Sequence, residues 1–267
     1  MKAAIWGCRG TVPAPGPATV RYGGNTSCVA VETAKGRLVV LDCGSGMRPL
    51  GNALAADPPA ELDILLTHMH LDHVAGLGFF APLFMDTTIR IWGPRLEGEP
   101  LSANIATYLS PPLFPVRFED IPANVEFAEV RDESWEIGGL SVTAAPVQHP
   151  GGALGYRLEE EGRTLAFIPD NELGLDPDAG VELATGADVL MHDAQYTDAE
   201  YPSKVGWGHS SVPDFAAFVR RTEPARAFMF HHDPAHDAET LEAMRDDAAE
   251  LAGREIELAA EGLTLTI

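Results

Sequence analysis

Short apolar runs recur along the chain, with turn-forming residues between them. Runs of this length that are rich in Val, Ile, Leu and Phe and bounded by Gly, Pro, Asn or Asp are typical of β-strands. The pattern predicts strands at Ala3–Trp6, Ser27–Glu32, Arg37–Leu41, Leu62–Leu66, Thr88–Trp92, Val125–Val130, Leu140–Ala144, Ala153–Leu158, Thr164–Ile168, Val189–Met191, Ala227–Phe230, Glu255–Leu258 and Leu263–Ile267.

Helical spacing of apolar residues is clearest near the C-terminus, at about Val212–Arg221 and Ala238–Ala252. Strands that are later interleaved with helices indicate sheets packed face to face with helices outside them. No linker interrupts the chain, so we expect one domain over residues 1–267. The stretch from Phe79 to Asn124 is rich in Pro and aromatic residues, which favours a structured loop or lid over a disordered spacer.

Acidic residues outnumber basic ones by a wide margin. The 267 residues carry 40 Asp and Glu against 18 Lys and Arg, a formal net charge of −22, while the apolar content of 45% is that of an ordinary globular protein. The composition excludes a disordered acidic chain. A surface of this charge repels polyanions, which argues against a long nucleic acid as the partner.

The three cysteines, Cys8, Cys28 and Cys43, show no CxxC spacing. They predict neither a disulfide framework nor a structural zinc knot, and we expect them to be buried free thiols. The apolar run at the N-terminus is too short for a signal peptide, and no window approaches the roughly 18 apolar residues of a membrane span. We therefore expect a cytoplasmic protein with no membrane partner.

An apolar strand runs directly into His68, His70, Asp72 and His73. Side chains at i and i+2 of an extended chain point the same way, so His68 and His70 can share one metal ion, and Asp72 and His73 at the start of the next helix can face a second. At this chain's frequency of 9 His in 267 residues, a chance match at these positions has a probability on the order of 10⁻³.

Further imidazole and carboxylate groups follow other predicted strands. They are His149, Asp170 and the adjacent pair His231 and His232. Zn²⁺ accepts both kinds of ligand, and a carboxylate can bridge two ions roughly 3.5–4 Å apart. Together with the first cluster, these residues predict a site for two ions.

The ordered set His68, His70, Asp72, His73, His149, Asp170 and His231 resembles the metallo-β-lactamase superfamily of hydrolases, over nearly the whole chain. An early strand ending in Leu41-Asp42-Cys43-Gly44 corresponds to the place where that family has a buried structural aspartate. The resemblance implies an α+β fold, a four-layer αββα sandwich, with the site at one edge of the two sheets.

The resemblance also implies the role of each ligand. One ion would be held by His68, His70 and His149, the other by Asp72, His73 and His231, with Asp170 bridging. His231 is preferred to His232 because the last ligand of the family directly follows an apolar strand. The implied cofactors are two divalent metal ions, with Zn²⁺ preferred and Mn²⁺ as the alternative.

The ligand set leaves the substrate open, because members of the superfamily cleave β-lactams, thioesters, lactones, sulfates and phosphodiesters and also carry out oxygen chemistry. The stretch Met191–Tyr196 followed by Gly208-His209-Ser210-Ser211 resembles the phosphodiesterase branch, which includes transfer-RNA 3′-processing endonucleases and small-molecule phosphodiesterases. By this resemblance His209 is the general acid at the leaving group, and Asp72 orients the attacking hydroxide. The alternative is that His209 only neighbours Ser210 or Ser211, one of which would be the N-cap of the helix that begins near Val212.

Two observations separate the chain from the transfer-RNA endonucleases of that branch. Their long clamp lies between the third and fourth metal motifs, whereas His149 and Asp170 are 21 positions apart here, and the net charge is −22. We therefore expect a phosphodiesterase that acts on a small cyclic or nucleoside-type diester, as a monomer or a homodimer. The alternatives are a carboxylic-ester, thioester or lactone hydrolase of the same fold, and an iron-dependent oxygen-using or binding protein. Two residues outside the ligand set are also considered. We expect Arg9 to be exposed and Trp207 to be packed, and the alternative is that they line the substrate pocket.

Overall fold

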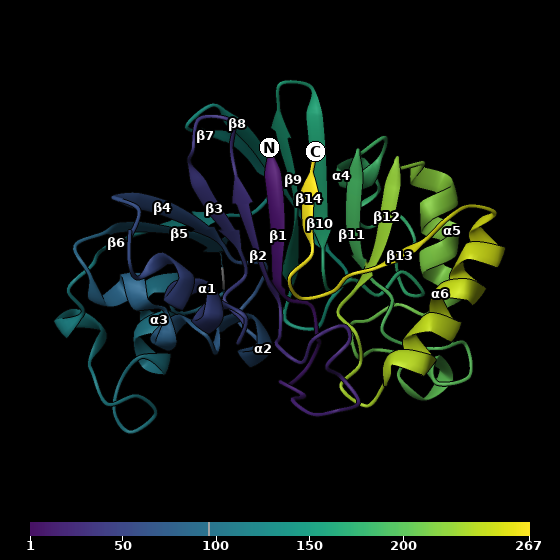
Figure 1. Cartoon of the computed structure of the whole chain (residues 1–267), viewed down its shortest axis with the longest axis horizontal. Coiled ribbons are helices and arrows are strands. Elements are labelled where there is room, and N and C mark those ends of the chain that lie inside the picture. Colours follow the sequence, from purple (N-terminus) through teal and green to yellow (C-terminus); the bar gives the residue numbers. More distant parts are fainter. Residues whose placement is uncertain (96) are drawn as a thin grey trace.

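The computed structural model describes residues 1–95 and 97–267. Its strands form two seven-stranded sheets, in the orders β14-β1-β2-β3-β4-β5-β6 and β13-β12-β11-β10-β9-β8-β7. The sheets lie back to back, with α1, α2 and α3 outside the first and α4, α5 and α6 outside the second (Figure 1). The predicted αββα sandwich is confirmed.

The first sheet combines antiparallel and parallel pairing. Its strands are β1 (Lys2–Gly7), β2 (Cys28–Glu32), β3 (Leu38–Leu41), β4 (Glu61–Leu65), β5 (Thr88–Pro94), β6 (Asn124–Val130) and β14 (Thr264–Thr266), and its helices are α1 (Met47–Leu54), α2 (Leu71–Val74) and α3 (Leu101–Tyr108). The strands β3 to β6 are parallel to one another, whereas β14, β1, β2 and β3 pair antiparallel.

The second sheet is also mixed. It contains β7 (Glu133–Ile137), β8 (Leu140–Val147), β9 (Ala153–Glu160), β10 (Arg163–Ile168), β11 (Val189–Asp193), β12 (Arg226–Phe230) and β13 (Glu257–Leu258), with α4 (Val181–Ala184), α5 (Val212–Thr222) and α6 (Ala238–Ala252). An antiparallel meander from β7 to β10 is followed by parallel pairing from β10 to β13.

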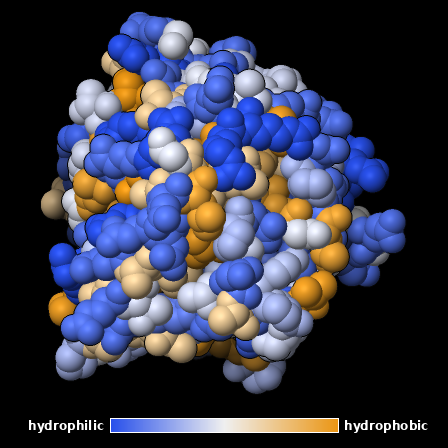
Figure 2. All heavy atoms as spheres, turned by 90° about the vertical axis from the view of Figure 1, so that its right-hand side faces the viewer, coloured by the Kyte–Doolittle hydropathy of each residue, from blue (hydrophilic) through white to orange (hydrophobic). Residues whose placement is uncertain are grey.

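Apolar side chains fill three layers. The layer between the sheets contains Ile5, Leu41, Phe167 and Phe230, and one further cluster lies between each sheet and its helices. Because the central strands are buried on both faces, they appear in the sequence as nearly continuous apolar runs. The outer face over α5 and α6 is mostly hydrophilic, with smaller apolar patches (Figure 2).

Most of the predicted elements are present. The edge strand β7 was missed because four of its five residues are at least partly exposed, and its sequence ESWEI lacks an apolar run. The described residues between Phe79 and Asn124 are structured, as predicted, and contain β5, α3, two complete 3₁₀ turns and the end of a third. Ser211 is the N-cap of α5, since its Oγ accepts a hydrogen bond from the backbone N–H of Asp214 at 3.3 Å. All three cysteines are buried and free, as predicted.

No helix among residues 1–95 and 97–267 is long and apolar enough to cross a membrane. The strand order explains where a site can form. The strands β3, β4, β10, β11 and β12 all end at the same edge of the sandwich, the lower edge in Figure 1, where α2 lies. Loops at the carboxyl ends of parallel strands are the usual place for ligands in such sheets.

Candidate metal centre

The structure brings together all seven predicted ligands at this edge. Their donor atoms form overlapping groups of three that lie within 4.8 Å of one another: His68, His70 and His149; His68, His73 and Asp170; Asp72, His73 and His231. The loop after β4 supplies two of the seven and helix α2 supplies two more, while the loops after β8, β10 and β12 supply one each. Both sheets therefore contribute to one cluster.

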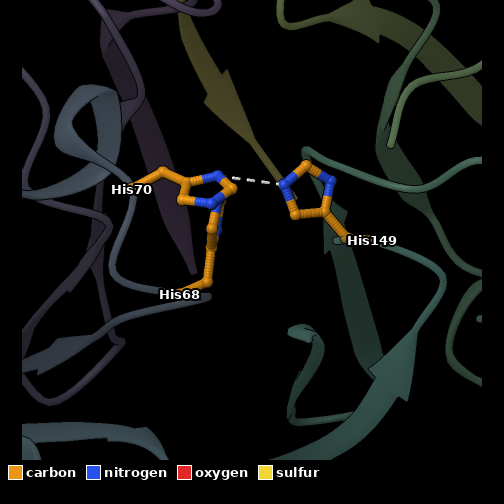
Figure 3. A group of neighbouring side chains, drawn as sticks. All are labelled: His68, His70 and His149. Atoms are coloured by element: carbon orange, nitrogen blue, oxygen red, sulfur yellow. Dashed lines mark hydrogen bonds between the residues drawn. The ribbon is translucent and has the colours of Figure 1, made fainter. Parts of the chain in front are cut away.

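The first trio is His68, His70 and His149. The two histidines of the extended segment before α2 face His149, which comes from the opposite sheet (Figure 3). The Nε2 atom of His149 lies 3.1 Å from Nδ1 of His70, and the ring centroids of His68 and His70 are 4.5 Å apart. This arrangement agrees with the i and i+2 geometry expected from the sequence.

The second trio is Asp72, His73 and His231. The Oδ2 atom of Asp72 lies 3.1 Å from Nε2 of His231 and 3.3 Å from Nε2 of His73. His231 has a left-handed backbone, with φ of 56°, directly after β12. The adjacent His232 lies outside the groups, where its Nε2 atom bonds to the carbonyl oxygen of Ala259 at 2.9 Å. Of the two neighbouring histidines, only His231 therefore faces the cluster.

Asp170 lies between the two trios. Its Oδ1 atom is 3.2 Å from Nε2 of His73 and 3.4 Å from Nε2 of His231. Its Oδ2 atom is 3.8 Å from Nε2 of His68 and 3.9 Å from Nε2 of His149. One carboxylate oxygen thus faces each trio, as a bridging ligand requires.

Three donor atoms in the cluster are buried without a hydrogen-bond partner in the part of the chain that the structure describes. They are Nε2 of His68, Nε2 of His73 and Oδ1 of Asp170. Buried polar atoms are nearly always satisfied in native proteins, so three orphaned atoms aimed at one space indicate a missing partner. Imidazole and carboxylate are the donor types that Zn²⁺ prefers. The residues present therefore fit divalent metal ions.

Neighbouring residues orient the imidazoles. The Nδ1 atom of His73 lies 2.7 Å from Oδ2 of Asp42, and Nδ1 of His231 lies 2.7 Å from Oε1 of Gln195. The Nδ1 atom of His149 bonds to the carbonyl oxygen of Gly208 at 2.9 Å. Each contact leaves Nε2 directed at the cluster, which is how metal-binding histidines are usually held.

The electrostatics of the cluster favours ionised carboxylates. Burial alone would raise the pKa of Asp72, but the imidazoles of His73 and His231 hold it well below its usual range. The pKa of Asp170 is likewise held low by His231 and His73 against the effect of burial. Burial, with a contribution from His73, lowers the pKa of His68 well below 6.5. Carboxylate and neutral imidazole are the forms that bind metal.

His209, the predicted acid, lies against the same cluster. Its Nδ1 atom donates a hydrogen bond to Oδ2 of Asp193 at 3.0 Å and is 3.9 Å from Oδ2 of Asp170. Its ring stacks on that of His231, with centroids 4.7 Å apart. Burial alone would lower the pKa of His209, but Asp193 raises it to about 9. The contact with Asp193 therefore favours the protonated form of this imidazole beside the predicted ligands.

Sequence reasoning missed three residues that support the site. Asp193, the last residue of β11, contacts His209, and Gln195, two positions later, contacts His231. This i and i+2 spacing was visible in the sequence. Glu172 gave no local signal. Its buried carboxylate accepts hydrogen bonds from the backbone N–H of Gly206 at 2.6 Å and of Gly208 at 2.7 Å, and so holds the loop that carries the carbonyl partner of His149.

Two further expectations were wrong. Arg9 is fully buried, because its guanidinium donates hydrogen bonds to the carbonyl oxygens of Gly23, Asp233 and His236 at 2.8–2.9 Å and ties the β1–β2 loop to the loop between β12 and α6. Trp207 is 58% exposed and not packed. Its loop is held by backbone hydrogen bonds to Glu172, so the indole is not needed to anchor it.

Comparison with known proteins decides the family. The model of the beta-lactamase superfamily domain matches residues 37–232, which include all seven predicted ligands. The chain belongs to the metallo-β-lactamase superfamily. With its His/Asp cluster, it is a metal-dependent hydrolase of that superfamily.

The relatives of this superfamily member are distant. A ribonuclease Z of Mycobacterium avium is 29% identical over 249 residues, which cover 83% of this chain and 85% of the relative. The Zn²⁺-bound PqqB from Methylobacterium extorquens superposes with a TM-score of 0.72 at 21% identity, with 100% of both chains covered. A diphosphatase from the PhnP family superposes with a TM-score of 0.71 at 19% identity, covering 100% of this chain and 97% of that one. At these identities the two structures show the fold alone.

Proposed function

We propose that the protein is a dinuclear metal-dependent phosphodiesterase that hydrolyses a small cyclic or nucleoside-type diester. The observation that carries the proposal is the position of Asp170, which turns one oxygen to each histidine trio and lies 3.9 Å from the predicted acid His209. Two ion positions and a proton donor would activate the attacking water, stabilise the charge on phosphorus and protonate the leaving oxygen of a phosphodiester.

The division of labour among the residues follows from their contacts. Two divalent cations, when bound, supply a water of lowered pKa and offset the charge of the phosphate. Asp72 is fixed beside them, because its Oδ2 atom accepts a hydrogen bond from the backbone N–H of Thr11 at 2.7 Å. It orients the attacking water. His209, held in its protonated form by Asp193, gives its proton to the leaving oxygen.

Local and overall charge together favour a small substrate. The predicted ligands include only two carboxylates, so two bound dications would leave the centre positive and attractive to a monoanionic diester. The molecule as a whole carries −22, which opposes a long nucleic acid. The names of the relatives, a ribonuclease Z and a diphosphatase, support phosphoester chemistry.

The proposed metal is Zn²⁺, with Mn²⁺ as the alternative. The five histidines and two aspartates suit the borderline softness of Zn²⁺. The similar PqqB structure is described as Zn²⁺-bound, which supports the same preference.

The test combines metal analysis with a substrate screen. Protein loaded with Zn²⁺ or Mn²⁺ is expected to bind two equivalents and to hydrolyse bis(p-nitrophenyl) phosphate in preference to a thioester or a lactone. Asp72→Ala should remove this activity, and Asp246→Ala, on the exposed surface of α6, serves as the control. One equivalent of metal, native iron in excess of zinc and manganese, or faster turnover of the thioester or lactone would overturn the proposal. Faster cleavage of a 3′-extended transfer RNA would overturn its small-substrate part.

A further inference from the structure

A large cavity opens next to the metal centre. It has a volume of about 590 Å³ and lies at the carboxyl ends of β5 and β6, against the turn between β8 and β9. Pro94, Val130, Pro146 and Leu154 form an apolar part of its wall. The volume is within the range of roughly 300–1,000 Å³ that is typical of small-molecule sites.

One wall of the cavity is formed by residues that neighbour the segments carrying His149 and His68. Gly151 and Gly152 line it, and the backbone N–H of Gly152 closes the turn by bonding to the carbonyl oxygen of His149 at 3.0 Å. Leu154 lines the same wall and bonds through its N–H to the carbonyl oxygen of Thr67, the residue before His68, at 2.9 Å. A ligand in the cavity would therefore lie beside the segments that contain His149 and His68, two of the predicted metal ligands.

Two arginines lie on the neighbouring strand ends. Leu65 of β4 pairs with Trp92 of β5, and Pro94 of β5 pairs with Val130 of β6. The backbone N–H of Arg95 bonds to the carbonyl oxygen of Val130 at 2.9 Å, so Arg95 and Arg131 directly follow paired strand ends. The same sheet contains β4, the strand that precedes His68.

Arg95 and Arg131 line the cavity and are exposed. Within residues 1–95 and 97–267, neither forms an ion pair, whereas Arg90 and Arg117 on either side of Arg95 in the sequence both do. Glu97 and Glu99 also border the cavity without pairing to either arginine. Two unpaired guanidiniums in one cavity are unexpected in a chain of net charge −22. The planar guanidinium matches the oxygens of a phosphate in a bidentate geometry.

We propose that this cavity binds a second phosphate of the substrate, carried on the half of the diester that lies next to His149, through Arg95 and Arg131. The inference rests on the proposed phosphodiesterase function and names its substrate class, a nucleotide-type diester with an additional phosphate. The apolar wall would contact the nucleoside that joins the two phosphates.

The kinetic test compares thymidine 5′-(p-nitrophenyl phosphate) with and without a 3′-phosphate, so that both substrates lose the same leaving group. The metal-loaded protein is expected to have a KM about tenfold or more lower for the phosphorylated substrate. The double variant Arg95→Gln/Arg131→Gln should lose this preference. Arg163→Gln removes one positive charge at the start of β10, at the opposite end of the strand that precedes Asp170, and should keep the preference.

A binding measurement separates this inference from the proposed function. Calorimetric titration of the metal-loaded protein with thymidine 3′,5′-bisphosphate and with thymidine 5′-phosphate needs no turnover. The bisphosphate should bind about tenfold or more tightly than the monophosphate, and the double variant should bind both equally. Equal affinities in the unsubstituted protein, or the same loss of preference in Arg163→Gln, would overturn the inference. Failure to hydrolyse either diester, with the binding preference intact, would instead refute the phosphodiesterase function.

Discussion

Replacing His209 by glutamine should slow the hydrolysis of diesters in proportion to how poor their leaving group is. With Asp193 at 3.0 Å, the pKa of His209 is raised to about 9. At pH 7 the protonated ring then exceeds the neutral one by about a hundredfold. Bound dications would lower this pKa, whereas the Asp193 carboxylate opposes that effect.

The expected loss follows from what the proton does. An alkoxide leaves poorly without a proton, so His209→Gln should lower kcat for an alkyl nucleoside diester by about 10²–10⁴-fold, the usual contribution of a general acid. The p-nitrophenolate ion leaves without a proton, so kcat for a p-nitrophenyl diester should change little. His236→Gln is the matched control, because His236 is buried and pairs with Glu200 outside the cluster.

The assay measures kcat for both diesters from pH 5 to 10 and counts bound metal in each variant. Deprotonation of a raised-pKa acid removes activity as pH rises. Asp193→Asn, which lowers the pKa of His209, should therefore move the alkaline limb for the alkyl diester to lower pH. Equal slowing of both diesters by His209→Gln, or loss of metal, would refute its role as the acid and make it a ligand or a structural residue.

The remaining predictions concern the ligands, the loop and the buried histidines. Asp72→Ala should reduce diesterase turnover by several orders of magnitude with an unchanged circular dichroism spectrum, because the ligands lie on loops outside the core; near-native turnover would contradict its assigned role. Glu172→Gln should weaken the hold on Gly208 and lower metal affinity about 10–100-fold, the usual effect of losing an outer partner of a ligand, as measured by competition with a chelator; an unchanged affinity would exclude Glu172 as a positioning residue. Burial lowers the pKa of His232 to about 3. As pH falls below about 6.5, His232 becomes protonated in the unfolded chain but stays neutral in the folded chain. The free energy of unfolding should therefore be roughly 2 kcal/mol lower at pH 5 than at neutral pH. His232→Gln should flatten this part of the pH dependence of the urea midpoint, and an unchanged slope would contradict the argument.

The metal cluster was predictable where its geometry is local. His68, His70, Asp72 and His73 lie in one strand-to-helix segment, so their spacing alone indicates which side chains can meet. Asp170 and the pair His231 and His232 became candidates because they follow apolar strands, which parallel pairing brings to one edge. The bridging role of Asp170 and the choice of His231 over His232 came from the family resemblance.

Long-range polar contacts could not be obtained in this way. Glu172 accepts a hydrogen bond from the backbone N–H of Gly208, 36 positions away. Every residue except proline has such an N–H group, so the sequence does not indicate which one Glu172 binds. Arg9 reaches carbonyl oxygens 14 to 227 positions away. An arginine is usually exposed, and here only the folded arrangement of two loops supplies enough carbonyl acceptors to bury one.

The contribution of both sheets to one cluster has a mechanical consequence. His68, His73 and Asp72 belong to the first sheet, whereas His149 and Asp170 belong to the second. Ions held between them would act as removable cross-links that clamp the open edge of the sandwich. Each ion that binds only the folded chain adds about 4 kcal/mol of stability when its free concentration is a thousand times its Kd. The availability of metal would then govern how long the protein survives proteolysis, as well as how fast it turns over.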